Sequence, residues 1–231
     1  MSDELYFGED AINSAIKEME DSRELYELLH DKIISMITRD RDLKVLVHSF
    51  KARFKDIEHL REKIIRKNQA DIALPEGQRL GPITAENIKE RVTDFCGIRI
   101  LHLYQGQFEN IHRVITDYIK RGELALYEKP KAYTWDPEYS KYFQDLGLDS
   151  ILRSTLYTSV HYVVKAREDS DITCEIQVRT LFEEVWGEID HALNYPIPTE
   201  IVAVQEQLKV LSRVVGAGTR LADSIFRLSS R

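Results

Sequence analysis

The feature that most constrains the fold of this chain is a pair of alternating segments, at residues 158–165 and 172–180, separated by the acidic turn REDSD. In the second segment the apolar residues are Cys174, Ile176 and Val178, and the polar residues between them are Glu175, Gln177 and Arg179. A period of two residues is typical of a strand that buries one face. Two such strands joined by a short turn predict an antiparallel hairpin. Its open face would carry a carboxylate, an amide and a guanidinium in a row.

The segments beside this hairpin follow other periods. GIRILHLY (97–104) is expected to form a strand, and residues 107–120 are expected to form an amphipathic helix. Another helix should follow the hairpin and stop at PIP (196–198). The buried stripe expected on that helix consists of Phe182, Val185, Trp186, Ile189 and Leu193. Strands and helices therefore mix in the middle of the chain.

Both ends of the chain are expected to be helical. Gly and Pro are absent from 9 to 74, and apolar residues recur at helical spacing, so residues 9 to about 69 are expected to form helices. A last helix is expected over 199–229, in which GAG (216–218) is a candidate break. The fold class is therefore α+β, with a mixed sheet flanked by helices. The boundaries we expect are an N-terminal helical region at 1–47, a central domain at 48–198 and a C-terminal helix at 199–231.

Composition excludes several classes of protein. With 43% hydrophobic and 31% charged residues, the 231-residue chain is typical of a soluble globular protein. Its net charge of −7 disfavours a broadly basic surface that coats nucleic acid, although a local basic pocket stays open. The two cysteines form no Cys-x-x-Cys motif, which favours reduced thiols and a cytoplasmic location. No apolar stretch approaches the roughly 20 residues needed to span a bilayer, and the acidic N-terminus is no signal peptide.

One segment has an unusual composition. Residues 126–150 contain six aromatic residues and two prolines, and they lie between the expected helix and hairpin. A long connection of this kind inside a compact domain is often functional. A packed surface flap is an equally good interpretation, and the sequence does not choose between them.

Two carboxylates are candidates for metal chemistry. Asp94 comes just before one expected strand, and Glu175 lies inside another. Paired carboxylates on neighbouring strands can hold Mg²⁺ and activate a hydroxyl for phosphoryl transfer. An Asp before a strand is, however, more often only a turn residue. The pair gains weight only if folding brings the two side chains together.

Two further clusters fit a nucleotide. In LYTSVHYVV, Tyr157, Ser159 and His161 share one strand face; a tyrosine ring can stack on a base, and a histidine can donate to a phosphate. In KARFKDIEHLREKIIRK (51–67) seven basic residues face three acidic ones, which suits a triphosphate. Each cluster also has an ordinary interpretation, as a satisfied sheet residue or as a solvated helix with salt bridges.

Taken in order, these stretches resemble the synthetase domain of the RelA/SpoT family, the enzymes that make the alarmones pppGpp and ppGpp. The matching stretches are RFKDIEHLREKIIRK, DFCGIRI, YTSVH, EIQVRT and WGEIDHALNY, over about residues 48 to 195. The resemblance implies a nucleotidyltransferase-like fold and a Mg²⁺-dependent GTP pyrophosphokinase, which moves the pyrophosphate of ATP to the 3′-hydroxyl of GDP or GTP. It also implies a small, single-domain synthetase or an excised catalytic domain.

The resemblance implies a role for individual residues. Asp94 and Glu175 would be the catalytic and metal-binding carboxylates, with Glu175 as ligand or general base. The residues expected to bind ATP are Arg53, Lys55, Lys63 and Arg66. The residues expected to bind the acceptor are Tyr157, His161, Arg153, Gln177 and Arg179.

One departure from the family pattern leaves the acceptor open. The usual Pro-Lys-x-Asn-Gly before the tyrosine is replaced by LRSTL (152–156), where Arg153 stands for the lysine, Thr155 for the asparagine and Leu156 for the glycine. The alternatives are pyrophosphate transfer to the 3′ end of tRNA or to an adenine nucleotide, and a non-catalytic module that senses a nucleotide. The amphipathic C-terminal segment also raises the prospect of a homo-oligomer.

Overall fold

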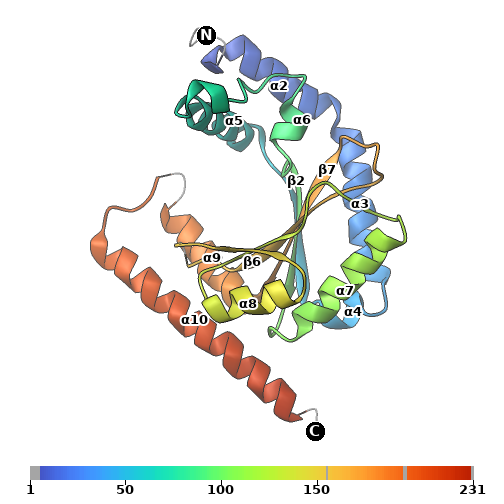
Figure 1. Cartoon of the computed structure of the whole chain (residues 1–231), viewed down its shortest axis with the longest axis vertical. Helices are drawn as coiled ribbons and strands as arrows, with labels where there is room; N and C mark the ends of the chain where they lie inside the picture. Colours follow the sequence, from blue (N-terminus) through green and yellow to red (C-terminus); the bar gives the residue numbers. More distant parts are fainter. Residues whose placement is uncertain (1–5, 155, 195–196, 230–231) are drawn as a thin grey trace.

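A mixed sheet forms the centre of the computed structural model, which describes residues 6–154, 156–194 and 197–229 (Figure 1). Within these residues the sheet has seven strands in the order β1-β2-β7-β6-β4-β5, with β3 paired to β6. Their bounds are β1 Ser49–Phe54, β2 Cys96–His102, β3 Ala125–Leu126, β4 Lys131–Thr134, β5 Asp149–Leu152, β6 Ser159–Lys165 and β7 Thr173–Thr180. The pairs β2–β7 and β4–β5 are parallel, and the other pairs are antiparallel. The predicted α+β class and mixed sheet are confirmed.

Helices cover the sheet on both sides (Figure 1). They are α2 Glu9–Asp21, α3 Arg23–Arg39, α4 Leu43–Leu46, α5 Ile57–Ile72, η1 Glu76–Gln78, α6 Ile88–Arg91, α7 Gln107–Lys120, α8 Pro137–Asp145, α9 Leu181–Asn194 and α10 Val202–Ser229. The amphipathic stripes of α3 and α7 pack on the apolar face of the sheet and form the core with it. Helix α9 lies over the opposite face. None of the helices in the described part is long and apolar enough to cross a membrane.

The predicted hairpin is confirmed as β6 and β7, which pair antiparallel. Its apolar members Cys174, Ile176 and Val178 are at most 1% exposed, and they point into the core. The polar face continues across the neighbouring strands, because directly paired residues point to the same side of a sheet. The register pairs one such row across five strands, consisting of Lys51, Arg99, Gln177, His161 and Lys131.

Residues 49–54 form a strand, so the prediction of helix over the whole of 9 to about 69 is wrong here. This segment, β1, pairs with the edge of β2 from Ser49–Leu101 to Phe54–Cys96. The alternation in SFKARF places Phe50 and Phe54 against the core. The pairing of this strand with β2 and the burial of the two rings outweigh the weak local preference for helix in a sequence without Gly or Pro. The strand thereby turns basic side chains toward the open face.

The stripe expected on α9 is mostly wrong. Trp186 is buried, but Val185 is 54% exposed, and Phe182, Ile189 and Leu193 are also exposed. The helix instead turns Glu183 and Glu184 inward. The open face of the sheet is polar at this point, so it attracts carboxylates rather than apolar side chains. Periodicity identified an amphipathic helix but assigned the wrong face to the interior.

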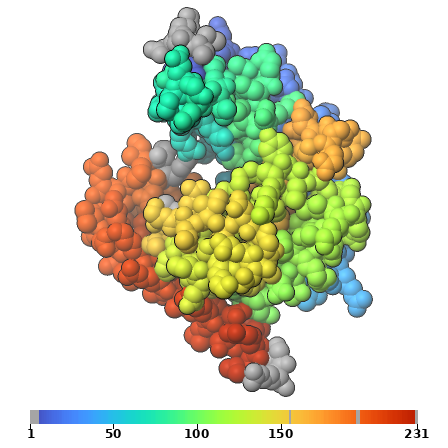
Figure 2. Space-filling model, viewed as in Figure 1, coloured from blue at the N-terminus to red at the C-terminus, as the bar shows by residue number. Residues whose placement is uncertain are grey.

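Helix α10 continues without a break through GAG, contrary to the expected interruption. Its glycines serve packing: an added Cβ at Gly218 would lie 2.8 Å from the Phe182 ring, and one at Gly216 would lie 3.7 Å from Trp135. Close approach of this kind is a common reason for glycine inside a helix. Figure 2 shows α10, in orange to red, along the side of the body next to the yellow segment around α8.

The aromatic segment 126–150 is largely ordered secondary structure rather than a loop. It supplies β4, α8 and the start of β5 at one end of the sheet. Phe143 of α8 is buried and packs edge-on against Phe108 of α7. Tyr133 of β4 contacts the ring of His161 on the other face of the sheet. The segment therefore both completes the core and reaches the polar face.

Candidate active site

A cavity of about 530 Å³ lies between the polar face of the sheet and α9. The predicted residues that line it are Arg53, Asp94, Tyr157, Glu175, Gln177 and Arg179. Strand register explains the assembly, because Arg53 of β1 pairs with Gly97 of β2, and Gly97 pairs with Glu175 of β7. Since Gly97 has no side chain, the floor of the cavity stays open between Arg53 and Glu175.

Asp94 lies two residues before β2, where it meets Lys55, which directly follows β1, and Lys63 of α5. Lys63 Nζ is 2.5 Å from its Oδ1, and Lys55 Nζ is 3.4 Å from its Oδ2. Burial disfavours the charged form of Asp94, but the charges of Lys63 and Lys55 outweigh burial and lower the pKa of this carboxyl. Burial also lowers the pKa of Lys55. Lys55 and Lys63 are thus gathered at this carboxylate.

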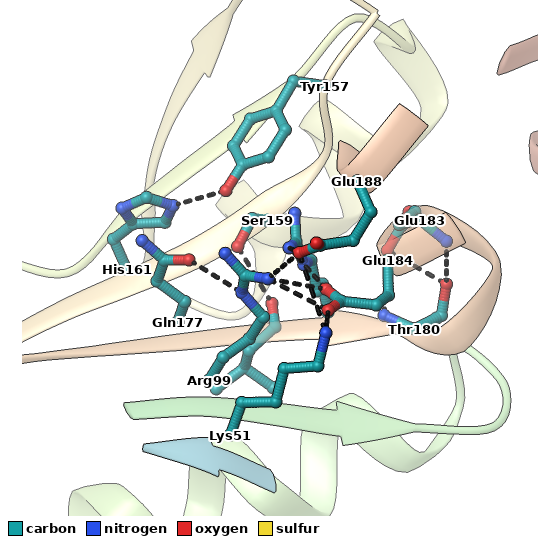
Figure 3. A network of polar contacts seen from close by, with 12 residues as sticks. Lys51, Arg99, Tyr157, Ser159, His161, Gln177, Thr180, Glu183, Glu184 and Glu188 are labelled. Atoms are coloured by element: carbon teal, nitrogen blue, oxygen red, sulfur yellow. Dashed lines mark hydrogen bonds and ion pairs between the residues drawn. The ribbon is translucent and has the colours of Figure 1, made fainter. Parts of the chain in front are cut away.

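Glu175 is held by two neighbours on its own sheet. His161 Nδ1 lies 2.8 Å from Oε1, and Gln177 Nε2 donates to Oε2 over 2.7 Å. Because a carboxylate only accepts, Nδ1 carries the proton of the first hydrogen bond. Burial raises the pKa of Glu175, and the hydrogen bond and charge of His161 more than offset this, so the net shift is downward. The other nitrogen of His161 lies 3.1 Å from the Tyr157 hydroxyl (Figure 3).

The centre of the charge network beside this cavity is Glu184, which is not among the residues predicted from the sequence. Glu184 of α9 accepts from Lys51 at 2.8 Å and from Arg99 at 2.9 Å (Figure 3). It also pairs with Arg179. Glu188, one turn later, pairs with Arg99 at 2.5 Å. Burial opposes ionisation of Glu184, but its three cations bring the pKa of this carboxyl down to about 2. One carboxylate therefore joins three neighbouring strands to α9.

Arg179 reaches Glu184 because α9 has a glycine at the crossing point. An added Cβ at Gly187 would lie 2.7 Å from Nη1 of Arg179. The helix begins with a capping box, in which Thr180 Oγ1 accepts from the Glu183 amide and the Glu183 carboxylate accepts from the Thr180 amide. Burial raises the pKa of Glu183 to about 7. The start of α9 is thus fixed directly beside the cavity.

Five predicted residues are not among those that line this cavity. Lys55 and Lys63 contact Asp94, and His161 contacts Glu175, so these three are one contact away from it. Arg66 and Arg153 lie farther out. Arg66 is an exposed residue of α5 and is not among the cavity-lining residues. Arg153 is exposed at the end of β5, where its guanidinium lies 4.8 Å from the centre of the Tyr133 ring. Thr155 belongs to the stretch LRSTL (152–156), which differs from the family pattern, and it lies outside the described residues.

The sequence did carry signals for some of the missed residues. Arg99 is a charged residue inside the otherwise apolar GIRIL. Glu188 and His191, which both line the cavity, are three residues apart in the sequence, a spacing that places them on one face of a helix. Lys51 belongs to the basic stretch that the sequence analysis identified. Glu184 had no distinctive local pattern, because an acidic residue in the first turn of a helix is common.

The carboxylates fit a metal bound together with a nucleotide better than a metal bound by protein alone. No group of three His, Cys, Asp or Glu side chains in the described ranges has the geometry to hold an ion. Asp94 and Glu175 line one cavity, and the charge of Asp94 acts on Glu175. Mg²⁺ is usually held by one or two carboxylates plus substrate phosphates. Oxygen donors from only two side chains match that pattern.

A family model described as the region found in RelA and SpoT proteins matches residues 52–200, more than half of the chain. The chain belongs to the RelA/SpoT family. A sequence relative is the GTP pyrophosphokinase YwaC of Bacillus subtilis, which is 25% identical over 151 residues. The alignment with YwaC covers 65% of this chain and 60% of YwaC.

Solved structures of this family share the fold. A GTP pyrophosphokinase family protein from Streptococcus pneumoniae superposes with a TM-score of 0.61 at 20% identity, over 90% of this chain and 91% of that one. The small alarmone synthetase 1 of Bacillus subtilis, bound to its product pppGpp, superposes with a TM-score of 0.60 at 18% identity, over 90% and 94% of the two chains. The expected mixed sheet flanked by helices is thus the fold of these solved structures as well.

Proposed function

We propose that this RelA/SpoT family chain is a GTP pyrophosphokinase, which transfers the β,γ-pyrophosphate of ATP to the 3′-hydroxyl of GDP or GTP. The observation that carries the proposal is the position of Glu175 in the cavity. It lies between the basic residues around Asp94 on one side and the Tyr157–His161 pair on the other. A donor triphosphate and an acceptor nucleoside can then meet at one carboxylate, which is the positioning that phosphoryl transfer requires.

In the reaction Glu175 would accept the proton of the 3′-hydroxyl. The 3′-oxygen would attack the β-phosphorus of ATP. The bond from that phosphorus to the oxygen it shares with the α-phosphorus would break, and AMP would leave with that oxygen. Arg53, Lys55, Lys63 and Arg66 would bind the phosphates and base of ATP. Tyr157 would stack on the acceptor base, and Gln177 and Arg179 would line the site of transfer. His161 and Gln177 hold both oxygens of Glu175, which fixes the direction in which the base points.

Asp94 and Glu175 would hold Mg²⁺ together with the triphosphate oxygens. The ion would neutralise charge that develops on the transferred group. Lys55 and Lys63 contact Asp94 in the structure, so their charges are close to where the triphosphate would bind. Both lysines would exchange part of this contact for phosphate oxygens when ATP binds.

The test is to identify the products by chromatography. Protein incubated with ATP, GTP and Mg²⁺ should yield AMP and pppGpp, and Glu175→Gln should lower the rate at least 10³-fold, because loss of a base and ligand removes several kcal/mol of stabilisation. Glu168→Gln is the matched control, since Glu168 is exposed in the turn of the same hairpin. Full activity of Glu175→Gln, or no AMP from wild type with any guanine nucleotide, would contradict the proposal.

A second candidate is the same transfer to the 3′ end of tRNA or to an adenine nucleotide. It is favoured by the changed acceptor stretch 152–156 and by the exposure of Arg153 at the edge of the sheet. Parallel reactions with GDP, GTP, ADP and tRNA, each with labelled ATP, distinguish the acceptors by the product that carries the label. A non-catalytic sensing module would bind nucleotide in all of them and release no AMP.

The expected homo-oligomer stays a proposal. Its support is a row of exposed apolar side chains on α10, which includes Val210, Val214, Leu221, Ile225 and Leu228. Light scattering at several protein concentrations measures the oligomeric state directly.

A further inference from the structure

Tyr133 contacts two of the residues that are expected to bind the acceptor, His161 and Arg153. It belongs to β4, where it pairs with Ser159 of β6. This register turns its ring to the polar face of the sheet, where its centre lies 4.9 Å from that of His161 at an interplanar angle of 79°. The guanidinium of Arg153 lies over the same ring, 4.8 Å from the ring centre. The tyrosine therefore touches both residues at once.

Arg153 is held by this ring rather than by a carboxylate. Within the described ranges no acidic side chain lies within 4 Å of its guanidinium, whereas Lys55, Lys63, Arg99 and Arg179 all contact acidic side chains. The backbone of Arg153 is fixed to β4, because its amide donates to the Thr134 carbonyl over 2.8 Å. A guanidinium that stacks on a ring keeps its N–H edge free for an anion.

His161 depends on Tyr133 in a different way. Both of its nitrogens have partners, Glu175 on one side and the Tyr157 hydroxyl on the other. The tilt of the imidazole decides whether both contacts can form, and the edge-on ring of Tyr133 limits that tilt. The hydroxyl of Tyr133 itself has no hydrogen bond to any residue in the described chain. The ring alone accounts for both contacts.

We propose that Tyr133 is a positioning residue, which holds Arg153 in place to bind the phosphate attached to the 5′ side of the acceptor nucleoside. This inference rests on the proposed function. A phosphate fits because a guanidinium forms charge-assisted, bidentate hydrogen bonds with it. The phosphate could belong to the diphosphate of a free nucleotide or to the phosphodiester before an RNA 3′ end. Through His161 the same ring also supports the base that activates the acceptor.

The first experiment measures both substrates in Tyr133→Leu and Tyr133→Phe. Tyr133→Leu should raise the KM for the acceptor about five-fold, the value that corresponds to a cation–π contact worth about 1 kcal/mol, and should leave the KM for ATP unchanged. Tyr133→Phe should restore the acceptor KM to within two-fold of wild type. Tyr127→Leu is the matched control, because Tyr127 has a similar partly exposed ring in the same segment but contacts Glu90 instead.

A double-mutant cycle with Arg153→Met tests whether Tyr133 acts through the arginine. In the Arg153→Met background, Tyr133→Leu should change the acceptor KM less than two-fold. Equal effects in both backgrounds, an equal rise in the KM for ATP, or a Tyr133→Phe variant as weak as Tyr133→Leu would overturn the inference. Running the cycle once with GDP and once with tRNA as acceptor identifies the source of the phosphate. Only the acceptor whose phosphate Arg153 binds should show an effect of Tyr133→Leu on KM that depends on Arg153.

Equilibrium dialysis separates this inference from the proposed function. Wild type should bind GDP or tRNA more tightly than Tyr133→Leu, whereas the two should bind guanosine, which lacks a 5′-phosphate, equally. If wild type shows this pattern but transfers no pyrophosphate, the proposed function fails and the role of Tyr133 stands. If Tyr133→Leu binds GDP and tRNA as tightly as wild type does, the role of Tyr133 is refuted whatever the turnover.

Discussion

Replacing Glu184 by Gln removes the charge on which three cations of the sheet converge. The substitution keeps the size and hydrogen-bonding oxygen of the side chain, so it tests charge rather than packing. Glu184 is 8% exposed, and it contacts Lys51 of β1, Arg99 of β2 and Arg179 of β7. Without its charge, the one ion pair left to Arg179 in the described part of the chain would be a contact at 3.9 Å with the half-exposed Glu188.

The expected loss of stability follows from the pKa of Glu184. Its cations lower that pKa from the ordinary value of 4.5 to about 2, and each unit corresponds to about 1.4 kcal/mol. The charge therefore contributes about 3 kcal/mol at pH 7, and about 2 to 3 kcal/mol after an allowance for Lys51, which is half-exposed to solvent. A lowered pKa gives stability that is present above pH 4.5 and is lost as pH falls toward 2. The difference between wild type and Glu184→Gln should thus shrink to about 1 kcal/mol at pH 3.

The assay is urea unfolding followed by circular dichroism at pH 7, 5, 4 and 3. Glu188→Gln is the matched control, because Glu188 lies one turn later on α9 and contacts the same cations, but is 53% exposed. It should cost less than about 1 kcal/mol at every pH. Equal effects of the two substitutions, or a Glu184→Gln effect that does not decrease with acid, would refute the idea that a buried charge holds α9 to the sheet.

Two further predictions concern the same helix. Burial raises the pKa of Glu183 to about 7, so its contribution to stability is fully present below pH 4.5 and is lost as pH rises through 7. The stability of Glu183→Gln relative to wild type should therefore increase by about 2 kcal/mol between pH 5.5 and 8 in thermal or urea unfolding, and a difference independent of pH would contradict it. Gly187→Ala should destabilise by about 1 to 3 kcal/mol, because the new Cβ would lie 2.7 Å from a buried arginine. Gly218→Ala, whose Cβ would meet the half-exposed Phe182 ring, should change urea stability by less than about 1 kcal/mol, and similar losses in both would rule out this explanation.

The polar face of the hairpin could be predicted from sequence, because alternation is a local property of one strand. Residues two apart must share a face, whatever lies around them. This is why Glu175, Gln177 and Arg179 were expected together and are found together in one cavity. That Asp94 lies near Glu175 could only be suggested, because the two residues are 81 positions apart in the chain and only folding brings them together.

The residues that the sequence analysis placed wrongly depend on neighbours distant in the chain. Residues 49–54 form a strand because the edge of β2 was available for pairing. Glu184 of α9 faces inward because three cations, each from a different strand of the sheet, meet there. In α9 this attraction outweighs the apolar stripe, which stays exposed at Val185.

The amino-acid sequence by itself determined which side chains each element carries on each face, because spacing along a strand or helix fixes direction. It determined the hairpin, the amphipathic helices and the polar composition of the open face. Only the tertiary structure decided which of those faces meet. Strand register brings Arg53, Gly97 and Glu175 into one row, and it brings Tyr133 into contact with both Arg153 and His161. Register and pairing depend on the free energy of the whole packed sheet, which no local spacing records.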